Sequence, residues 1–185
     1  MQKAGLCRKQ IAMFRAPTDA DFAVLAEMRR DVSMQAMLMA IPEATDDESV
    51  RQWIERRTRD PGGMFRVITD ADQKDAIGFI QVSQVNRRNR NGYGAVAVSK
   101  RARIPGVGQI AMRELMRAAC CDLGLLKLLA EIRVDNFPAI QMNLMSGYSI
   151  IGTLEAHFTD AGGKLHDVLL FERLLDPSEF QRASH

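Results

Sequence analysis

The sequence predicts an α/β (α+β) fold in which helices cover both faces of a mixed, mostly antiparallel seven-stranded sheet. The first observation is the order of apolar periodicities along the chain, which gives β-α-α-β-β-β-α-β-α-β-β. The second is a run of strands joined by short polar turns, which is typical of an antiparallel meander. The third is a strand–helix–strand unit over residues 93–134, whose crossover makes its two strands parallel.

The first third of the chain predicts one strand and two helices. Residues 11–17 form a short strand, and residues 18–30 form a helix with its cap at one of the first two positions. Residues 46–57 form the second helix, because acids in its first turn and arginines in its last turn suit the helix dipole. The Met-rich residues 33–42 between the two helices favour a place in the core over a place in a pocket.

The middle of the chain predicts the meander. Residues 64–69 and 76–85 alternate apolar and polar side chains, as two antiparallel strands with one solvated face do. The polar turn 86–92 then leads into residues 93–99. This third segment is apolar on both faces, which places it inside the sheet.

The last part of the chain predicts two helices and three further strands. A helix over residues 107–123 ends at a glycine and is followed by a strand over residues 127–134. A shorter helix over residues 137–146 also ends at a glycine. Two strands over residues 148–158 and 166–175 complete the sheet.

Bulk composition limits the functions that the chain can have. Its 185 residues suit one domain over residues 1–185, with a core over about residues 13–175. A net charge of +2 does not favour a general polyanion binder. The cysteines are odd in number, and the spacing of Cys7, Cys120 and Cys121 predicts neither disulfides nor a metal site. Without an apolar span or a signal peptide, we expect a cytoplasmic protein with no membrane partner.

The segment SKRARIPGVGQIA, residues 99–111, predicts an anion site at a helix start. Gly106 and Gly108 let an anion approach the backbone closely, and the first helical turn offers unpaired N–H groups with a partial positive charge. Arg103 adds a charge-assisted contact. The same glycines could serve only a tight turn. The Rossmann and Walker fingerprints are both absent, so a dehydrogenase or an NTPase is not expected.

The run VAVSKRARIPGVGQIAM resembles the acetyl-CoA motif of the GNAT superfamily of N-acetyltransferases, V-x-P-x-x-[RQ]-x-x-G-x-[GA]. It aligns with residues 98–108, with Lys100 in place of the usual proline. Downstream, VDNFPAIQMNLMSGYSIIG is similar to the second family signature, N-x-x-[AS]-x-x-x-[YV]-x-x-x-G-[FY]. The fixed positions of that signature are filled by Asn136, Ala139, Gly147 and Tyr148. The tail is similar to the RimJ/RimL-like branch, and the GVGQIAM stretch to PseH-type amino-sugar-nucleotide N-acetyltransferases.

The resemblance implies the GNAT fold and acetyl-CoA as cosubstrate, with no metal. The strand at Val96 and Val98 would pair with the pantetheine arm, and backbone N–H groups between residues 104 and 110 would hold the pyrophosphate. Asn136 would contact the cofactor, although it is also an excellent N-cap. The residues expected at the cofactor are Val96, Val98, Arg103, Ile104, Gly106, Val107, Gly108, Gln109, Asn136 and Asn143.

The family's catalytic pattern is incomplete in this chain. Asn143 stands where many relatives carry the tyrosine that protonates the leaving thiolate, and an amide is not an acid near neutral pH. The segment NGYGAVAV also lacks the frequent glutamate. The remaining base candidates are Glu131, His157 and Asp135. Glu131 could equally be exposed to solvent or paired with an arginine, and a lone histidine such as His157 is more often structural.

The expected function is therefore acetyl transfer from acetyl-CoA to a primary amine, with a small acceptor such as an aminosugar nucleotide. A protein N-terminus is the alternative acceptor, and a non-catalytic acyl-CoA sensor is the alternative class. Arginines and lysines gather over residues 87–103 and are expected to be a solvated loop or to attract phosphate. Nucleic acid is not an expected partner, because no aromatic residues interleave with these charges. We expect a monomer or a homodimer.

Overall fold

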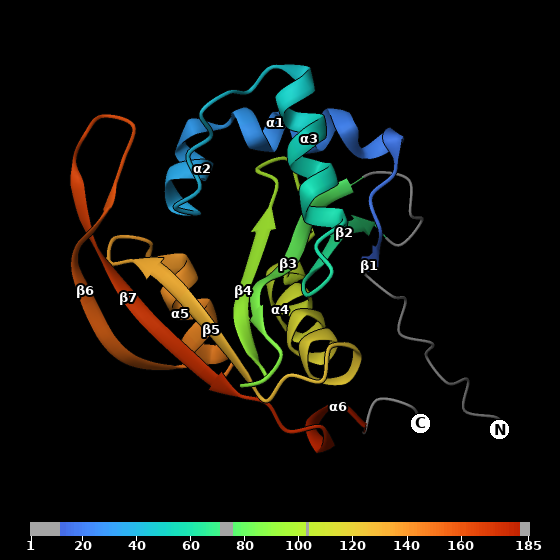
Figure 1. Cartoon of the computed structure of the whole chain (residues 1–185), viewed down its shortest axis with the longest axis vertical. Coiled ribbons are helices and arrows are strands. Elements are labelled where there is room, and N and C mark those ends of the chain that lie inside the picture. Colours follow the sequence, from blue (N-terminus) through green and yellow to red (C-terminus); the bar gives the residue numbers. More distant parts are fainter. Residues whose placement is uncertain (1–11, 71–75, 103, 182–185) are drawn as a thin grey trace, which may run out of the picture.

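A seven-stranded sheet with the strand order β1-β2-β3-β4-β5-β7-β6 forms the frame of the molecule (Figure 1). The computed structural model describes residues 12–70, 76–102 and 104–181. Only β4 and β5 pair in parallel, and all other neighbours are antiparallel. The predicted mixed sheet is confirmed. The strands are β1 (Ala12–Arg15), β2 (Met64–Asp70), β3 (Ala76–Asn86), β4 (Asn91–Val98), β5 (Lys127–Arg133), β6 (Ser149–Thr159) and β7 (Leu165–Leu174).

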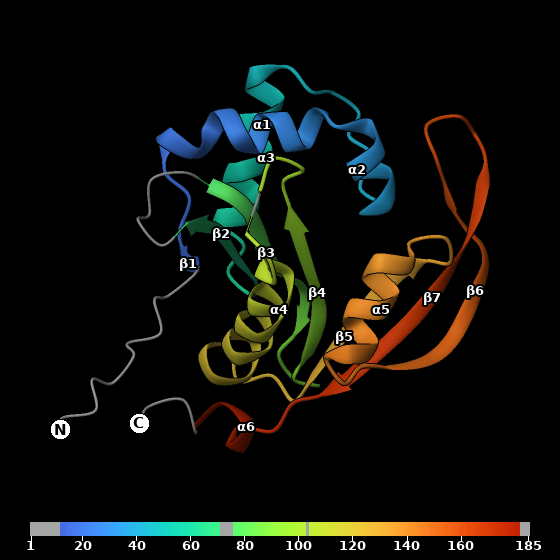
Figure 2. The same cartoon turned by 180° about the vertical axis from the view of Figure 1, so that it is seen from behind.

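Helices cover both faces of this sheet, as the sequence predicts (Figures 1 and 2). On one face lie α1 (Phe22–Arg30) and α3 (Asp47–Thr58), and on the other lie α4 (Val107–Arg117) and α5 (Phe137–Met145). A short α2 (Val32–Met37) forms in the Met-rich segment, for which the sequence predicts no helix. The predicted helix 107–123 is α-helical only to residue 117 and then continues as a π-helical turn to residue 122.

Two separate apolar cores follow from this layering. The first lies between the sheet and α4, where Leu115 and Ala111 are buried against Leu128 of β5. The second lies between the sheet and α1 and α3. In it, the ring of Trp53 packs edge-on against Phe65 at a centroid distance of 5.6 Å. Packing on both faces holds the strands of the sheet in place, so the backbone groups at their edges have fixed positions.

The sheet divides between β4 and β5. The two strands pair only over Asn91–Tyr93 and Lys127–Leu129, although β4 continues to Val98 and β5 continues to Arg133. Beyond these pairs the strands diverge, which Figure 1 shows as the opening between the two halves of the sheet. Strand β4 stays paired with β3 along its whole length, so the free backbone edge belongs to the open side of β4. Ligands commonly bind at such a division of a sheet.

Asp31 holds α2 in place at the top of this opening. Its carboxylate accepts from the backbone N–H of Met34 at 3.0 Å as the helix N-cap, and it pairs with Lys100 Nζ at 2.7 Å. The hydrogen bond from Lys100 is the largest cause that lowers the pKa of Asp31 to about 2. The helix α2 is thereby tied to the segment that follows β4.

We expect Asp31→Ala to lower the free energy of unfolding by about 1 kcal/mol at pH 7, because the cap and the ion pair are both lost. A carboxylate with a lowered pKa stabilises the fold fully above its ordinary value of 3.8, and this stabilisation is lost as the pH falls toward 2. Urea unfolding at pH 7 and pH 3 should therefore show a smaller difference between the variant and the wild type at pH 3. Asp31→Asn, which keeps the cap without the charge, should lie between them. Equal stability of Asp31→Ala and wild type at pH 7 would contradict this role.

Candidate active site

A pocket of about 110 Å³ lies where β4 and β5 separate. Its walls come from β4, β5, α4 and α5, together with the end of α2. Four residues that the sequence singles out line it together: Val96, Glu131, Asn136 and Asn143. The Met-rich segment also contributes Met37 to the wall, so this part of it lies at the pocket and not in the core, where the sequence analysis expects it.

The backbone of β4 presents hydrogen-bonding groups to this pocket. The N–H of Ser99 donates to Ile77 O of β3 at 2.8 Å, in the same register as the pairing of Val98 with Gly78. Because N–H directions alternate along a strand, the N–H groups of Val96 and Val98 point to the opposite side, where β5 has moved away. These N–H groups could donate hydrogen bonds to the carbonyl oxygens of an extended ligand that contains amides, or to an oxygen on which negative charge develops during a reaction.

Helix α4 begins beside the pocket with a left-handed glycine. Gly106 has φ +77°, and no heavy atom lies within 4 Å of the position that a Cβ would take. A Cβ on Gly108 would lie 3.2 Å from Met142 Sδ of α5. The space beside Gly106 is therefore open to an approaching group, whereas Gly108 lies against the Met142 side chain, and the contact of both glycines with an anion stays a prediction.

The first turn of α4 also leaves donors free. The N–H groups of Gln109 and Ile110 donate to Gly106 O at 3.1 and 3.2 Å, and that of Val107 donates to Ile104 O at 3.3 Å. Among the described residues, none accepts from the N–H of Gly106 or Gly108. Free N–H groups at a helix start are the donor set that a pyrophosphate needs, so this turn fits the diphosphate of CoA. The remaining predicted contact here, Arg103, lies outside the described residues.

The carboxylate of Glu131 lies in the opening between β4 and β5. It comes from β5, and its side chain is 31% exposed. Burial, followed by the charge and a hydrogen bond of Glu131, raises the pKa of the Tyr93 hydroxyl on β4. Glu131 is thus an acidic side chain of β5 that lies beside β4, whose segment NGYGAVAV contains no acid. Tyr93 does not line the pocket, but its hydroxyl interacts with Glu131, a contact that the sequence does not predict because the pairing of β4 with β5 is not local.

His157 reaches Glu131 from the β6–β7 hairpin, but it does not line the pocket. Its Nε2 lies 3.9 Å from Glu131 Oε2, and its side chain is 47% exposed. Asp135 is engaged elsewhere, since Arg133 Nη2 and Nε contact its two oxygens at 2.6 and 2.9 Å. This pairing with Arg133 is the largest cause that lowers the pKa of Asp135, which makes it a weaker base. Of the three base candidates, Glu131 alone lines the pocket.

Two asparagines on α5 complete the wall. Asn136 is the N-cap, since its Oδ1 accepts from Ala139 N at 3.4 Å. It also lines the pocket, and its contact with the cofactor stays a prediction. Asn143 is 4% exposed and donates from Nδ2 to Ala139 O at 2.9 Å. Its Oδ1 is buried and has no hydrogen-bond partner among the described atoms. A buried acceptor without a donor fits a ligand that brings an N–H or S–H group.

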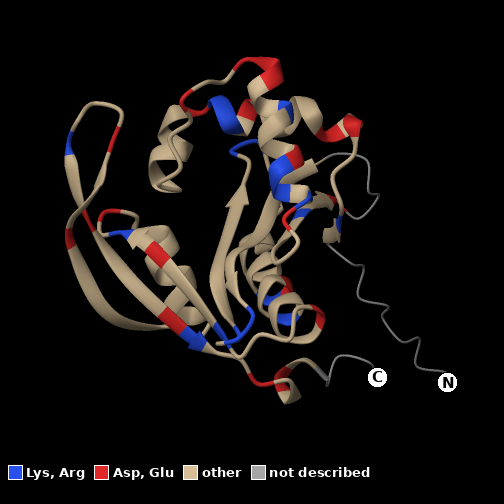
Figure 3. Cartoon of the chain, viewed as in Figure 1, with Lys and Arg blue, Asp and Glu red and all other residues tan. Residues whose placement is uncertain are grey.

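Within the described part of the basic segment, residues 87–102, no lysine or arginine lines this pocket. Arg87 donates to Pro61 O at 2.7 Å, and Arg90 donates to Gly124 O at 2.8 Å. Figure 3 shows basic residues at the turn that leads into β4. At the other end of β4, Lys100 pairs with Asp31, and Arg101 pairs with Glu27 at 2.8 Å. These contacts support the interpretation of a solvated, structurally paired loop.

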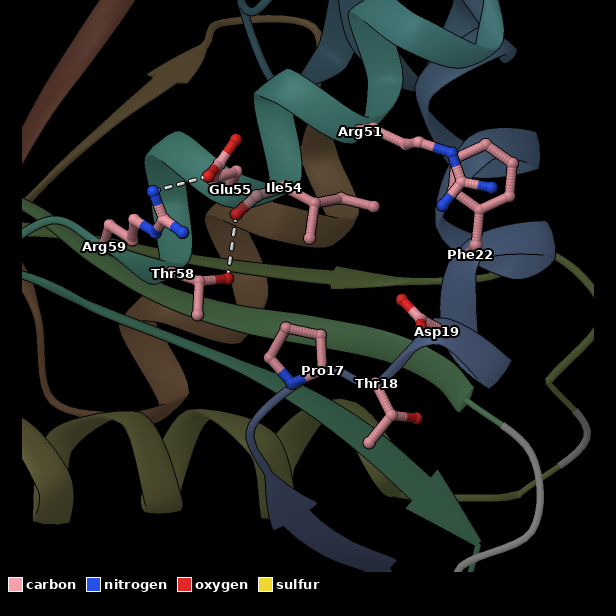
Figure 4. A pocket seen from close by; sticks show the side chains of 9 residues that line it. All are labelled: Pro17, Thr18, Asp19, Phe22, Arg51, Ile54, Glu55, Thr58 and Arg59. Atoms are coloured by element: carbon pink, nitrogen blue, oxygen red, sulfur yellow. Dashed lines mark hydrogen bonds and ion pairs between the residues drawn. The ribbon is translucent and has the colours of Figure 1, made fainter.

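A larger hollow of about 330 Å³ lies elsewhere, between the β1–α1 connection and α3 (Figure 4). The Arg51 guanidinium lies 4.2 Å from the centroid of the Phe22 ring at its rim, and Arg59 pairs with Glu55 at 2.6 Å. It contains none of the residues expected at the site. Within the described ranges, no group of three His, Cys, Asp or Glu side chains could hold a metal ion, and no helix is long and apolar enough to cross a membrane.

Comparison with known proteins identifies the family and the fold of this chain. Residues 12–148 match the family model of the acetyltransferase (GNAT) domain. No curated protein matches the chain. A spermidine N-acetyltransferase from Vibrio cholerae, in complex with CoA and spermine, superposes with a TM-score of 0.79 at 16% identity, covering 88% of this chain and 95% of that one.

Two further solved structures have the same fold. A probable acetyltransferase has a TM-score of 0.75 at 18% identity and covers 89% of this chain and 93% of its own. A dodecameric form of the Vibrio cholerae enzyme has a TM-score of 0.74 at 18% identity, covering 94% of this chain and 98% of its own. At these identities the likeness establishes the fold, while the acceptor and the assembly are decided by each protein's own residues.

Proposed function

This chain belongs to the acetyltransferase (GNAT) domain family and is an N-acetyltransferase, and from that premise we propose that it transfers the acetyl group of acetyl-CoA to a small cationic amine. The observation that carries the proposal is the pocket at the division of β4 and β5, where Glu131 faces the free backbone edge of β4. We also propose, from sequence resemblance, that the chain belongs to the RimJ/RimL-like branch of the family or is similar to its PseH-type members.

Residues on both sides of the pocket would hold the cosubstrate. The free N–H groups of Gly106 and Gly108 fit the diphosphate, and the β4 edge at Val96 fits the amides of the pantetheine arm. The unpartnered Oδ1 of Asn143 offers an acceptor on the opposite wall. When bound, acetyl-CoA supplies a thioester whose carbonyl carbon accepts the amine nitrogen.

The chain's own groups then account for the proton and charge changes. Glu131 accepts the proton that the amine must lose before or during attack. The N–H of Val98 donates to the carbonyl oxygen as negative charge develops on it. The C–S bond breaks as the N–C bond forms, and water protonates the departing thiolate, since Asn143 has no acidic proton to give.

The charge of the pocket favours a cationic acceptor. Among the described residues that line it, Glu131 is the one charged side chain. An aminosugar nucleotide, which the sequence analysis favours, carries phosphate charge, and no described lysine or arginine of the lining would meet it. Spermine is the ligand named for the Vibrio cholerae structure, and a polyamine has the charge that Glu131 would attract.

The proposal is tested by binding and turnover on the same preparation. Acetyl-CoA at 100 times its Kd should raise the free energy of unfolding by about 2.7 kcal/mol, visible as a higher Tm. Thiol release should then be measured with polyamines, aminoglycosides, aminosugar nucleotides and peptides with free N-termini. We expect turnover with polyamines or other polycationic amines.

Each other outcome of this experiment has a defined meaning. Turnover confined to aminosugar nucleotides or peptides would overturn the cationic acceptor and leave acetyl transfer intact. Stabilisation by acetyl-CoA without thiol release on any amine would favour the acyl-CoA sensor. Absence of stabilisation would contradict the cosubstrate itself.

A further inference from the structure

A polar pocket of about 330 Å³ lies between α1, α3 and the chain that connects α2 to α3. Arg29 of α1 and Arg56 of α3 line it, with Trp53 at its side and Ser49 and Gln52 along α3. The helices that line it, α1 and α3, cover one face of the sheet, whereas α4, which begins at the proposed diphosphate turn, covers the other face (Figures 1 and 2). The pocket also shares no lining residue with the proposed acetyl-transfer pocket, so the two are separate.

Arg29 is held rigidly at this pocket without a carboxylate partner. Its Nη1 donates to Gln35 Oε1 at 2.7 Å and to Ala40 O at 2.8 Å, and its guanidinium lies 5.2 Å from the centroid of the Trp53 ring. Both acceptors are uncharged, so they orient the guanidinium but do not neutralise it. Among the described residues, Arg29 forms no ion pair.

Two more arginines add positive charge near Arg29. Arg56 and Arg57 of α3 also form no ion pair with any described carboxylate, whereas Asp47 pairs with Arg30 and Glu55 pairs with Arg59. Burial, followed by repulsion from Arg57 and Arg56, lowers the pKa of Arg29. Like charges gathered around a partly buried cation raise the free energy of the unliganded state.

The chemistry of this pocket matches a phosphate group. Glu43 is the one carboxylate of the described lining, and it is exposed, so positive charge remains in excess. Guanidinium groups bind phosphate oxygens through paired N–H donors, and a dianion would compensate two of them at once. Stacking of a nucleic-acid base is not favoured, because Trp53 is buried beneath Arg29.

We propose that the pocket bounded by Arg29, Trp53 and Arg56 binds the phosphate group of a small phosphorylated molecule, or phosphate itself. The site uses the guanidinium of Arg29, fixed by Gln35 and Ala40, as its central donor. Arg56 and Arg57 supply the charge that draws the anion in. The site is distinct from the acetyl-transfer pocket and does not depend on the identity of the amine.

Trp53 makes the proposal directly measurable, because it is the only tryptophan of the chain. Its fluorescence should be followed during titration with inorganic phosphate and, separately, with glycerol 3-phosphate, against chloride at the same ionic strength. We expect a saturable change with at least one phosphate probe and none with chloride. A tighter response to glycerol 3-phosphate would identify a phosphorylated molecule as the ligand class, and a tighter response to phosphate would identify the free ion.

The double variant Arg56→Gln/Arg57→Gln should bind the probe at least about tenfold more weakly, since it removes the charge of Arg56 from the lining and the charge of Arg57 that acts on Arg29. The matched control is Arg51→Gln/Arg88→Gln, which removes two exposed arginines that form no described ion pair and should leave the response unchanged. The response should also persist in Gly108→Asp, which changes the α4 turn. Equal weakening in both double variants, loss of the response in Gly108→Asp, or no saturable change in wild type would overturn the site.

Discussion

Gly108→Asp is expected to weaken CoA and acetyl-CoA binding about 100-fold while the unliganded protein keeps its stability. The free N–H of residue 108 points to the proposed diphosphate, and a carboxylate beside it would repel that group. The same carboxylate suits the positive end of α4 in the unliganded protein. The closest atom to the new Cβ is Met142 Sδ at 3.2 Å, the end of a flexible side chain that can move aside.

Gly108→Asn is the matched control, because its side chain has the same size without the charge. Isothermal titration with CoA should give a much smaller loss of affinity for Gly108→Asn than for Gly108→Asp. Thermal unfolding of both unliganded variants should stay close to that of the wild type. If the two variants lose affinity equally, the effect is steric and the anion cradle at α4 is wrong. If neither loses affinity, the diphosphate binds elsewhere.

Glu131→Gln is expected to lower kcat by about 10²- to 10⁴-fold, the usual contribution of a positioned general base. The variant keeps the size of the side chain and a hydrogen-bonding oxygen toward Tyr93, so the pocket should retain its shape. Affinity for acetyl-CoA should change little, because Glu131 faces the acceptor and not the proposed diphosphate turn. The loss should therefore appear in the rate of thiol release and not in the stabilisation by acetyl-CoA.

Glu155→Gln serves as the control for charge, since Glu155 is exposed on β6 and does not line the pocket. It should leave kcat unchanged. Tyr93→Phe tests whether the hydroxyl beside Glu131 positions the carboxylate, and a moderate loss of kcat is expected for it. Wild-type turnover in Glu131→Gln would remove Glu131 as the base and return His157 to consideration.

Most of the fold could be predicted from the sequence, because its signals are local. The apolar periodicities place all seven strands and four of the helices near their observed positions. The short α2 was missed, since its helix begins only because Asp31 caps it while held by Lys100 from a distant segment. The change from α- to π-helix after Arg117 likewise has no sign in the apolar pattern.

For the candidate site, too, local features could be predicted from the sequence and contacts between distant segments could not. The sequence by itself determined the glycine turn at the start of α4, since close approach of an anion depends on the few residues from 104 to 110. Only the tertiary structure decided that Glu131 of β5 faces Tyr93 of β4 and that Asp135 is neutralised by Arg133. The physical reason is that such contacts depend on where two strands stop pairing, and this is set by packing across the whole sheet.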